Sequence, residues 1–422
     1  MIKSKHQQQS RREFLKASTA LIASPMLLSA QVLGREGSTP ANDKIVVGFV
    51  GMGERGFQVM ENFRDIRRND YRIVAVCDCY EKRACDAKEW VDLLYKNSDC
   101  QAYARYEDVL DRQGIDVVVI ATPDHWHTKI AVEACKAGKD VFCEKPLTLT
   151  PMESREIIAA ARKYNRVCSS GSQRIIEEYG YMAPVVRSGA LGEVKEAYVG
   201  MGGPPEDLYF PAEEIPPGLD WDRWLGPAPW VPYHWERYRG WYAGGWRRGW
   251  DYGNGLLADW GAHKLGAVMY FFGIDDQEPV EILPPHCEGN PRDELVWIFS
   301  SGHRIYHSQK DHDITLIGSE REYRHLKDRH RIKPIGPVDL RRYHGSSRTL
   351  AEDFAYCVRH RVRPFQDFIY GAATATACQL ANIAYKLNRP LKWDAATTSF
   401  INDDMANRFV FRPKRFPYSI RY

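Results

Sequence analysis

The chain has 422 residues, 44% of them hydrophobic and 27% charged, which is typical of a folded, water-soluble protein and long enough for two domains. Its formal charge is +3, but residues 1–30 alone carry +4, so the remainder is close to −1. A nearly neutral body lacks the broad basic surface that binds a polyphosphate backbone, which argues against nucleic acid as a partner.

The first predicted element is an export signal within residues 1–30. Ser10–Lys16 reads Ser-Arg-Arg-Glu-Phe-Leu-Lys and precedes a weakly apolar run, Ala17–Ala30, that is too short to span a membrane. This pattern resembles a twin-arginine signal; the alternative is an amphipathic basic helix. We expect cleavage near Ala30, a polar linker over residues 31–43, and a periplasmic protein that is exported folded and keeps no membrane anchor.

Residues 44–173 predict a doubly wound domain of the Rossmann type. Its first strand, Ile45–Val50, is continuously apolar, as expected for a strand buried on both faces of a parallel sheet. Similar runs follow at Arg72–Cys77, Asp116–Ala121, Asp140–Cys143 and Val167–Ser170, separated by helix-like stretches such as Arg55–Arg67 and Thr128–Ala137. This alternation of strand and helix indicates parallel strands joined by helical crossovers.

The first strand runs into a glycine-rich turn that suits a dinucleotide. The sequence Gly-Met-Gly-Glu-Arg-Gly over residues 51–56 opens a helix, so backbone N–H groups and the helix dipole can receive a pyrophosphate. Asp78 ends the second strand, where a carboxylate binds both ribose hydroxyls and repels a 2′-phosphate. We therefore predict NAD, with NADP kept open by the nearby Arg83. The predicted cofactor contacts are Gly51, Gly53, Glu54, Arg55, Gly56 and Asp78.

Two later strand ends are predicted to reach the same edge of the sheet. Ala-Thr-Pro-Asp-His-Trp-His (121–127) follows the fourth strand and Glu-Lys-Pro (144–146) follows the fifth. Open α/β sheets bind ligands at this edge, and Pro146 restricts the backbone that aims Lys145. The predicted contacts are Thr122, Pro123, His127, Glu144 and Lys145, with plain packing as the alternative for His127.

Residues 174–422 predict an α/β domain with a large open, mostly antiparallel sheet. Several strand-like runs alternate in polarity and lack regular intervening helices. They are Val194–Met201, Glu294–Phe299, Arg304–Gln309 and Asp313–Ile317, and the helical stretches Leu350–His360 and Ala372–Leu387 close the domain.

Eight of the twelve tryptophans lie between Leu219 and Trp260, interleaved with tyrosines and arginines. Flat aromatic faces pack on the C–H faces of sugar rings, so we predict a sugar-binding surface, with bracing of a loop as the alternative for any single ring. The interleaved arginines leave an acidic or a phosphorylated sugar open as the substrate. The predicted substrate contacts are Gln173, Arg174, Trp246 and Trp260.

The ten cysteines are predicted to be mostly buried thiols, because several fall in apolar element patterns. No paired Cys-x-x-Cys spacing is present, so we predict no structural metal.

Four motifs occur in one order along residues 44–422: the glycine-rich turn, Ala-Thr-Pro before a histidine, Glu-Lys-Pro, and Asp-Trp-Gly-Ala-His (259–263). In this the chain resembles the Gfo/Idh/MocA family of oxidoreductases, which includes glucose-fructose oxidoreductase and inositol dehydrogenase. The resemblance implies oxidation of a sugar or inositol hydroxyl and a homodimer or homotetramer formed through the open sheet. It also implies that Lys145 binds the reacting hydroxyl, His263 moves its proton, and Asp259 orients the sugar or the histidine.

Three functional hypotheses follow. The first is an exported sugar or glycoside oxidoreductase that oxidises C3 to a ketosugar and keeps its NAD bound, because the periplasm supplies little free NAD. The second is an NAD-dependent glycoside hydrolase with no net redox change. The third is a noncatalytic sugar-binding protein, against which the presence of both Lys145 and His263 argues. A polyol or inositol dehydrogenase is a further variant of the first.

Overall fold

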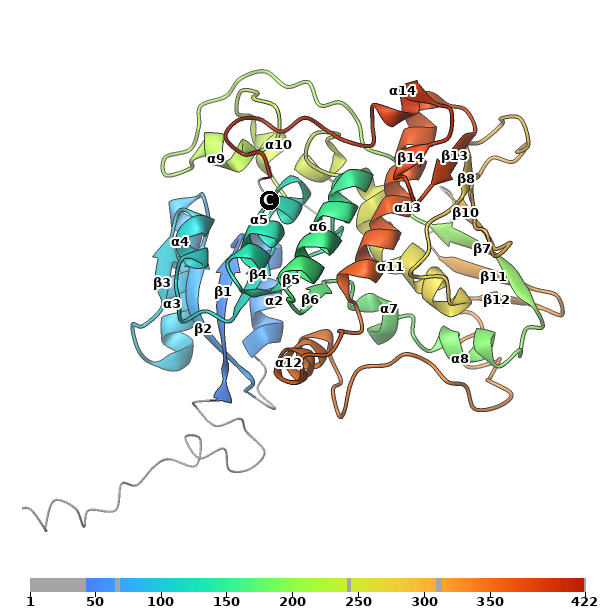
Figure 1. The fold of residues 1–422 in the computed structure, drawn as a ribbon, viewed down its shortest axis with the longest axis horizontal. Coiled ribbons are helices and arrows are strands. Elements are labelled where there is room, and N and C mark those ends of the chain that lie inside the picture. Colours follow the sequence, from blue (N-terminus) through green and yellow to red (C-terminus); the bar gives the residue numbers. More distant parts are fainter. Residues whose placement is uncertain (1–42, 65–68, 241–243, 309–312, 421–422) are drawn as a thin grey trace, which may run out of the picture. The chain divides into compact units, whose positions relative to one another are not determined.

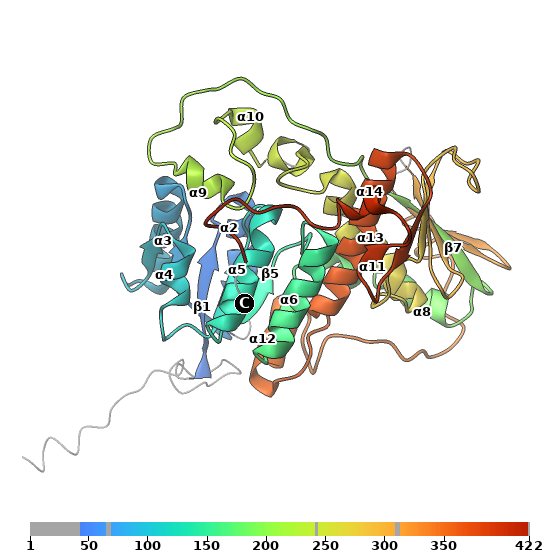
Figure 2. The same cartoon turned by 45° about the horizontal axis from the view of Figure 1, so that its top comes forward.

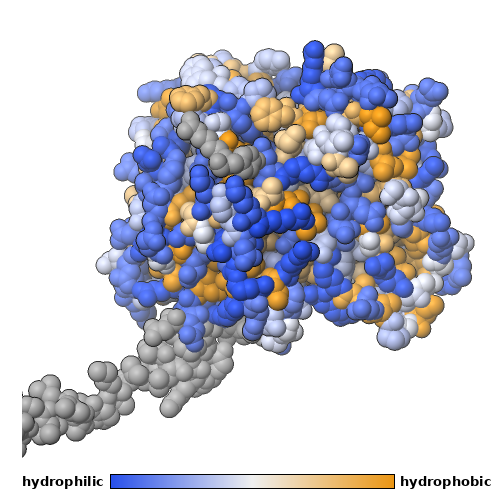
Figure 3. Space-filling view, in the orientation of Figure 1, coloured by the Kyte–Doolittle hydropathy of each residue, from blue (hydrophilic) through white to orange (hydrophobic). Residues whose placement is uncertain are grey.

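The computed structural model describes residues 43–64, 69–240, 244–308 and 313–420. The predicted export signal and almost all of the predicted linker lie outside these ranges. Within them, no helix combines the length and the apolar character needed to cross a membrane. Hydrophilic side chains dominate the face shown in Figure 3, with hydrophobic ones scattered between them.

A six-stranded parallel sheet spans residues 45–170, in the order β3-β2-β1-β4-β5-β6. Its strands are β1 (Ile45–Val50), β2 (Tyr71–Cys77), β3 (Gln101–Tyr103), β4 (Val117–Ile120), β5 (Asp140–Cys143) and β6 (Cys168–Ser170). Every residue of β4 and β5 is buried, which explains why these strands are continuously apolar in sequence. The predicted Rossmann-type sheet is confirmed.

Helices cover both faces of this sheet (Figure 1). On one face pack α2 (Glu54–Arg64), α3 (Glu81–Tyr95) and α12 (Leu350–His360), and on the other α4 (Tyr106–Leu110), α5 (Asp124–Lys136) and α6 (Pro151–Lys163). The helix α12 comes from late in the sequence, yet its Leu350 and Phe354 belong to the core of the first sheet. The chain therefore returns to its first sheet before the second one is complete.

The second sheet has eight strands in the order β12-β11-β7-β10-β9-β8-β13-β14. Only β7 and β10 pair in parallel, so the sheet is mixed and mostly antiparallel, as predicted. The strands are β7 (Val194–Gly200), β8 (Glu281–Leu283), β9 (Leu295–Ile298), β10 (Arg304–Ser308), β11 (Ile314–Gly318), β12 (Glu322–Arg324), β13 (Leu391–Asp394) and β14 (Ser399–Phe400). The sheet packs its inner face on α11 (Gly255–Phe272) and α13 (Phe368–Leu387), which run side by side (Figure 2).

The helix α11 matters most for function because it carries Asp259 and His263. Sixteen of its eighteen residues are buried, so packing fixes it on almost every side. It begins at Gly255, whose φ of +71° and close approach to Pro204 and Pro205 leave no room for a side chain. The shorter helices are α7 (Arg174–Glu177), α8 (Met182–Arg187), α9 (Trp221–Leu225), α10 (Trp235–Tyr238), η3 (Gly245–Arg248) and α14 (Asp404–Asn407).

Candidate active site

A cleft of about 590 Å³ opens at the carboxyl edge of the parallel sheet. Most of the residues predicted to form the site line it, although they come from the first sheet and its loops, from the tryptophan-rich segment and from α11. They are Gly51, Gly53, Glu54, Arg55, Asp78, Thr122, Pro123, Glu144, Lys145, Gln173, Arg174, Trp246, Asp259, Trp260 and His263. Gly56 and His127 are not part of the lining.

The glycine-rich turn is shaped by two close backbone contacts. Gly51 has a φ of +91°, and a Cβ there would lie 2.6 Å from the Thr122 amide nitrogen. A Cβ on Gly56 would lie 2.1 Å from the Gly51 carbonyl oxygen, so α2 can pack this close to the turn only without a side chain. Gly53 instead faces the cleft, with only Arg83 within 4 Å of its Cβ position. The turn therefore presents bare backbone and the start of α2 to the cleft, which suits a phosphate.

Asp78 ties the end of β2 to this turn. One carboxylate oxygen accepts a hydrogen bond from the Met52 amide at 2.7 Å and the other accepts one from the Tyr80 amide at 2.8 Å. Burial raises the pKa of Asp78, while Arg83 and the two amides oppose the rise. Each oxygen keeps a lone pair for a further donor, so the carboxylate can still bind a ribose.

Lys145 and Asp259 form an ion pair in the same cleft. Lys145 Nζ donates to Asp259 Oδ1 at 2.6 Å and to the Asp259 carbonyl oxygen at 3.1 Å. Arg247 Nε lies 3.7 Å from the same Oδ1. Burial alone would raise the pKa of Asp259, but Lys145 and Arg247 lower it below its usual range. The pair is therefore charged, and it fixes the lysine that follows β5.

His263 lies one helical turn beyond Asp259 and lines the cleft while being only 4% exposed. Burial, reinforced by the positive charges of Lys145 and Arg174, lowers its pKa well below the usual value. Its Nδ1 has no hydrogen-bond partner among the described residues. The hydrogen bonds of Asp259 go to Lys145, so the structure does not use Asp259 to orient this histidine. His263 is thus a neutral ring with an unsatisfied nitrogen.

His127 lies behind the cleft and does not line it, so the structure agrees with the packing alternative. The ring is 1% exposed, and its two nitrogens lie 2.9 Å from the Pro146 and Thr122 carbonyl oxygens. Because α5 begins at Asp124, position 127 points back between the ends of β4 and β5. His127 therefore links the two loops that carry Thr122 and Lys145.

Arg55 connects the glycine-rich turn to the Glu-Lys-Pro segment. This connection was not predicted from the sequence. Arg55 Nη2 lies 2.8 Å from Glu144 Oε1. The Gln173 side-chain amide is oriented so that its nitrogen donates to the Gly171 carbonyl oxygen. In this orientation the Gln173 side-chain oxygen accepts a hydrogen bond from Arg55 Nη2 at 3.1 Å. Attraction to Glu144 raises the pKa of Arg55. These contacts brace the middle of the cleft.

The tryptophan-rich segment divides into bracing and lining rings. Trp221 and Trp224 stack on each other at 4.6 Å and are at most 5% exposed, as expected for a packed insertion. Trp235, Trp246 and Trp260 line the cleft without belonging to this stack, whereas Trp224 both stacks and lines the cleft. Arg247 lies over Trp246 at 4.3 Å. The segment thus supplies both an internal core and an aromatic wall.

Asp124 is a site residue to which sequence reasoning gave no role. It starts α5, lines the cleft and is 3% exposed. Burial and the negative charge of Asp259 raise its pKa to about 8. A carboxyl group in this environment holds a proton near neutral pH, so the cleft contains an acid besides the neutral histidine. Its place directly after Pro123, at a strand end, was the signal available in the sequence.

Family models match most of the chain. Residues 45–172 match the NAD-binding Rossmann fold of an oxidoreductase family, and residues 205–323 and 339–420 match the C-terminal alpha/beta domain of that family.

Among curated proteins, similarity covers a shorter part. A glycosyl hydrolase family 109 protein of Shewanella baltica is 29% identical over 214 residues, which are 44% of this chain and 44% of that protein. An alpha-N-acetylgalactosaminidase of Shewanella oneidensis is 29% identical over 212 residues, with the same 44% shares. The match thus spans less than half the length of these relatives.

Solved structures share the fold over most of the chain. A myo-inositol 2-dehydrogenase from Lactobacillus plantarum has a TM-score of 0.56 at 18% identity and covers 83% of this chain and 99% of its own. The aldose-aldose oxidoreductase of Caulobacter crescentus, complexed with glycerol, has a TM-score of 0.54 at 18% identity and the same coverage. The WlbA dehydrogenase of Bordetella pertussis, in complex with NADH and UDP-GlcNAcA, has a TM-score of 0.57 at 14% identity and covers 83% of this chain and 98% of its own.

Proposed function

Since the chain belongs to the Gfo/Idh/MocA oxidoreductase family, we propose that it is an NAD-dependent enzyme acting on a hydroxyl of a sugar or glycoside. The observation that carries the proposal is the charged Lys145–Asp259 pair next to the neutral His263, in one cleft with the glycine-rich turn. Oxidation of an alcohol needs a donor to its oxygen, an acceptor for its proton and a hydride acceptor. In this cleft Lys145 can donate to the alcohol oxygen, His263 can accept the proton, and the glycine-rich turn can bind the cofactor that accepts the hydride.

The cleft fits a dinucleotide on two observations. Gly53 leaves the start of α2 uncovered, and the Asp78 carboxylate is held at the end of β2 by two backbone amides. The pyrophosphate would lie at residues 51–56, the adenosine ribose at Asp78, and the nicotinamide toward Glu144 and Lys145. Bound NAD supplies a hydride acceptor at the nicotinamide C4.

The residues of the chain divide the remaining work. Lys145, held by Asp259, donates a hydrogen bond to the reacting hydroxyl oxygen and stabilises negative charge on it. His263 accepts the hydroxyl proton. Its lowered pKa makes it a weak base, which suffices because a hydroxyl that loses hydride becomes strongly acidic. The aromatic wall at Trp246 and Trp260 would hold the face of the sugar ring.

We prefer NAD to NADP because the Asp78 carboxylate stands where a 2′-phosphate would have to lie. Arg83 favours NADP, since a guanidinium can bind its 2′-phosphate. The Arg83 guanidinium lies beside the glycine-rich turn and over the Tyr238 ring at 5.0 Å. Titration of the protein with each cofactor, followed by tryptophan fluorescence, distinguishes the two.

A second candidate function is an NAD-dependent glycoside hydrolase without net redox change. Two findings favour it: the relatives named glycosyl hydrolase family 109 protein and alpha-N-acetylgalactosaminidase, and the buried Asp124 in the cleft, whose pKa is raised. In this reaction a C3 hydroxyl is oxidised to a ketone, which acidifies the C2 hydrogen. The C1 substituent is then eliminated, water adds at C1, and the ketone is reduced again. Asp124 would protonate the leaving oxygen.

One experiment tests both functions. Protein lacking residues 1–30 is incubated with a panel of methyl and nitrophenyl glycosides, while absorbance at 340 nm and product masses are followed. A ketosugar with NADH supports the oxidoreductase, whereas cleaved glycoside without net NADH supports the hydrolase. Binding of sugars without any product would refute both and leave a sugar-binding protein. Stoichiometric NAD in protein purified without added cofactor would support retention of the cofactor during the cycle.

We also propose export to the periplasm by the twin-arginine route, on the basis of Arg11 and Arg12. Replacing both with lysine should keep the protein in the cytoplasm, as measured by cell fractionation. The open sheet leads us to propose a homodimer or homotetramer, which light scattering after size-exclusion chromatography tests. A monomer at micromolar concentration would refute that assembly.

A further inference from the structure

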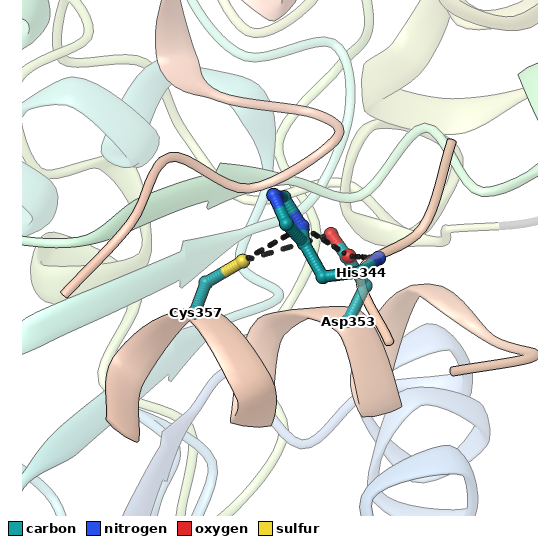
Figure 4. A group of neighbouring side chains, drawn as sticks. All are labelled: His344, Asp353 and Cys357. Atoms are coloured by element: carbon teal, nitrogen blue, oxygen red, sulfur yellow. Dashed lines mark hydrogen bonds and ion pairs between the residues drawn. The ribbon is translucent and has the colours of Figure 1, made fainter. Parts of the chain in front are cut away.

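Three side chains of types that bind metal ions lie together outside the cleft, at the helix α12. His344 precedes this helix, while Asp353 and Cys357 lie within it (Figure 4). Each of the three residues offers one ligand atom, and these atoms all lie within 4.8 Å of one another. No other such group of three occurs in the described part of the chain. The helix α12 and the cleft-lining α10 lie at opposite ends of the first sheet in Figures 1 and 2. The group is therefore separate from the candidate active site.

Local structure brings the three side chains together. The Thr349 side chain caps the N-terminus of α12 by accepting from the Glu352 amide, so the helix starts at a defined residue. Asp353 and Cys357 are four residues apart and share one face of the helix. The Asp353 carboxylate accepts hydrogen bonds from the His344 amide at 2.7 Å and the Phe365 amide at 2.8 Å. These bonds hold the loop that carries His344 against the helix.

The distances between the ligand atoms are close to those of a tetrahedral zinc site. His344 Nδ1 lies 2.8 Å from Asp353 Oδ1 and 3.4 Å from Cys357 Sγ. The other Asp353 oxygen, Oδ2, lies 3.9 Å from Cys357 Sγ, and one ligand atom from each residue lies within 4.8 Å of the other two. Ligand bonds of about 2.0 to 2.3 Å at tetrahedral angles separate such atoms by roughly 3.3 to 3.6 Å. Side-chain shifts of about an ångström would therefore admit an ion between all three.

The charges of the group also favour a cation. Asp353 is fully buried, and within the described ranges no lysine or arginine pairs with it; its ion-pair partner is His344, which is charged only when protonated. A buried carboxylate is stable when it is paired or coordinates a metal. The His344 side chain is 34% exposed, so an ion and a water ligand can arrive from solvent on its side.

We propose that His344, Asp353 and Cys357 form a site for a divalent transition-metal ion, best suited to Zn²⁺, with water as the fourth ligand. Nitrogen, oxygen and sulfur donors together favour Zn²⁺ over Mg²⁺ or Ca²⁺, which prefer oxygen ligands alone. The proposal would replace the prediction of no structural metal, which rested on Cys-x-x-Cys spacing. The ligands here are nine and four residues apart and come from a loop and a helix.

Metal binding at this site must release a proton. Burial and the Asp353 charge raise the pKa of the Cys357 thiol, so the metal-free group carries a neutral thiol. When the ion binds, the S–H bond breaks, the thiolate sulfur donates its electron pair to the metal, and one proton goes to solvent. The imidazole must also be neutral at Nδ1. Affinity should therefore rise with pH, and binding should release at least one proton per ion.

The site would fasten the loop before α12 to a helix that packs on the first sheet, so its expected effect is on stability and not on the cleft. At a zinc concentration about one hundred times the dissociation constant, the melting temperature should rise by about 3 °C or more.

The test uses Co²⁺ as a spectroscopic probe on protein lacking residues 1–30. The expected result is one Co²⁺ per chain, with visible bands of tetrahedral coordination and a near-ultraviolet thiolate-to-metal band. The Cys357→Ser variant should lose the thiolate band, and His344→Ala should lower affinity at least tenfold. His360→Ala, at the exposed end of the same helix, and the exposed Cys85→Ser are matched controls that should bind as the parent does.

Asp353 is left unchanged because it holds two backbone amides, so its loss would unfold the loop. Circular dichroism and the metal-free melting temperature show that each variant is folded before titration. An octahedral Co²⁺ spectrum without the thiolate band would overturn the proposal. Equal binding by the parent, Cys357→Ser and His344→Ala would overturn it as well, because the bound ions would then be adventitious.

Discussion

Replacing Lys145 with methionine tests whether the Lys145–Asp259 pair acts in the reaction or only in the fold. Methionine keeps most of the apolar stem but removes the ammonium that lies 2.6 Å from Asp259 Oδ1. Loss of one charged donor at an oxygen that gains negative charge costs about 2.7–4 kcal/mol of transition-state stabilisation, or roughly 10²- to 10³-fold in kcat. We expect this loss on whichever glycoside the parent protein turns over.

The same change should also lower stability. Breaking a buried ion pair costs about 3–5 kcal/mol when the remaining charge has no other partner. Arg247, 3.7 Å from Oδ1, still attracts the Asp259 carboxylate. We therefore expect a loss nearer 1–3 kcal/mol in the free energy of unfolding, measured by urea denaturation.

Lys129 offers a matched control. It pairs with Glu133 at 2.6 Å, and its side chain is 8% exposed against 14% for Lys145, but it lies outside the cleft lining. Lys129→Met should lose a comparable free energy of unfolding and keep its kcat. If Lys145→Met kept more than a third of the parent's kcat, or if both variants lost activity in proportion to stability, the role given to Lys145 would be wrong.

Three further predictions concern the cofactor turn and the pH response. Asp78→Asn should weaken NAD binding about tenfold or more and NADP binding less, as measured by fluorescence titration; an unchanged ratio would contradict the ribose role. Gly51→Ala should lose more stability than Gly302→Ala: the two have φ values of +91° and +84°, but nothing lies within 4 Å of a Cβ at Gly302. Burial lowers the pKa of both His125 and His307 to about 4, so the unfolded chain binds protons first as pH falls. The free energy of unfolding should therefore be highest above about pH 6.5 and fall toward pH 4, by up to about 1.4 kcal/mol per pH unit for each histidine. The His307→Phe variant should show a smaller decrease with pH in thermal melts.

The parts of the fold that sequence predicts well are those in which the cause is local. The strands β1, β4 and β5 are buried on both faces, so each reads as an unbroken apolar run, and the glycine turn is recognisable because Gly51 and Gly56 have no room for a side chain. The three-residue β3 and the two-residue β14 had no predicted counterpart, because neither forms an apolar run and so few positions cannot display a period. The return of α12 to the first sheet depends on contacts with residues almost 300 positions earlier, such as that of Tyr71 with Ala351.

Most of the residues predicted for the site line the cleft, but the sequence did not predict which of them contact one another. Lys145 and Asp259 were both singled out, but they are 114 residues apart, and the family resemblance had assigned Asp259 to the sugar or to His263. His127 follows a motif at the ligand-binding edge, yet its rotation on α5 turns it away from the cleft. Asp124 was passed over because its raised pKa arises from burial and from Asp259, and neither is visible in a sequence.

The proton that His263 accepts has a different fate in each of the two proposed reactions. Once His263 accepts the hydroxyl proton, an imidazolium stands in a buried position near Lys145 and Arg174, the arrangement that lowers its pKa in the first place. That proton is therefore held weakly and is readily given back. An enzyme with net oxidation must pass it to solvent, whereas a cycle that later reduces the same ketone needs it again at the same oxygen. A weakly basic histidine gives up its proton readily in either reaction, so the destination of the proton distinguishes the two. In a redox-neutral cycle proton release to bulk solvent should not accompany turnover, which a weakly buffered assay with a pH indicator measures directly.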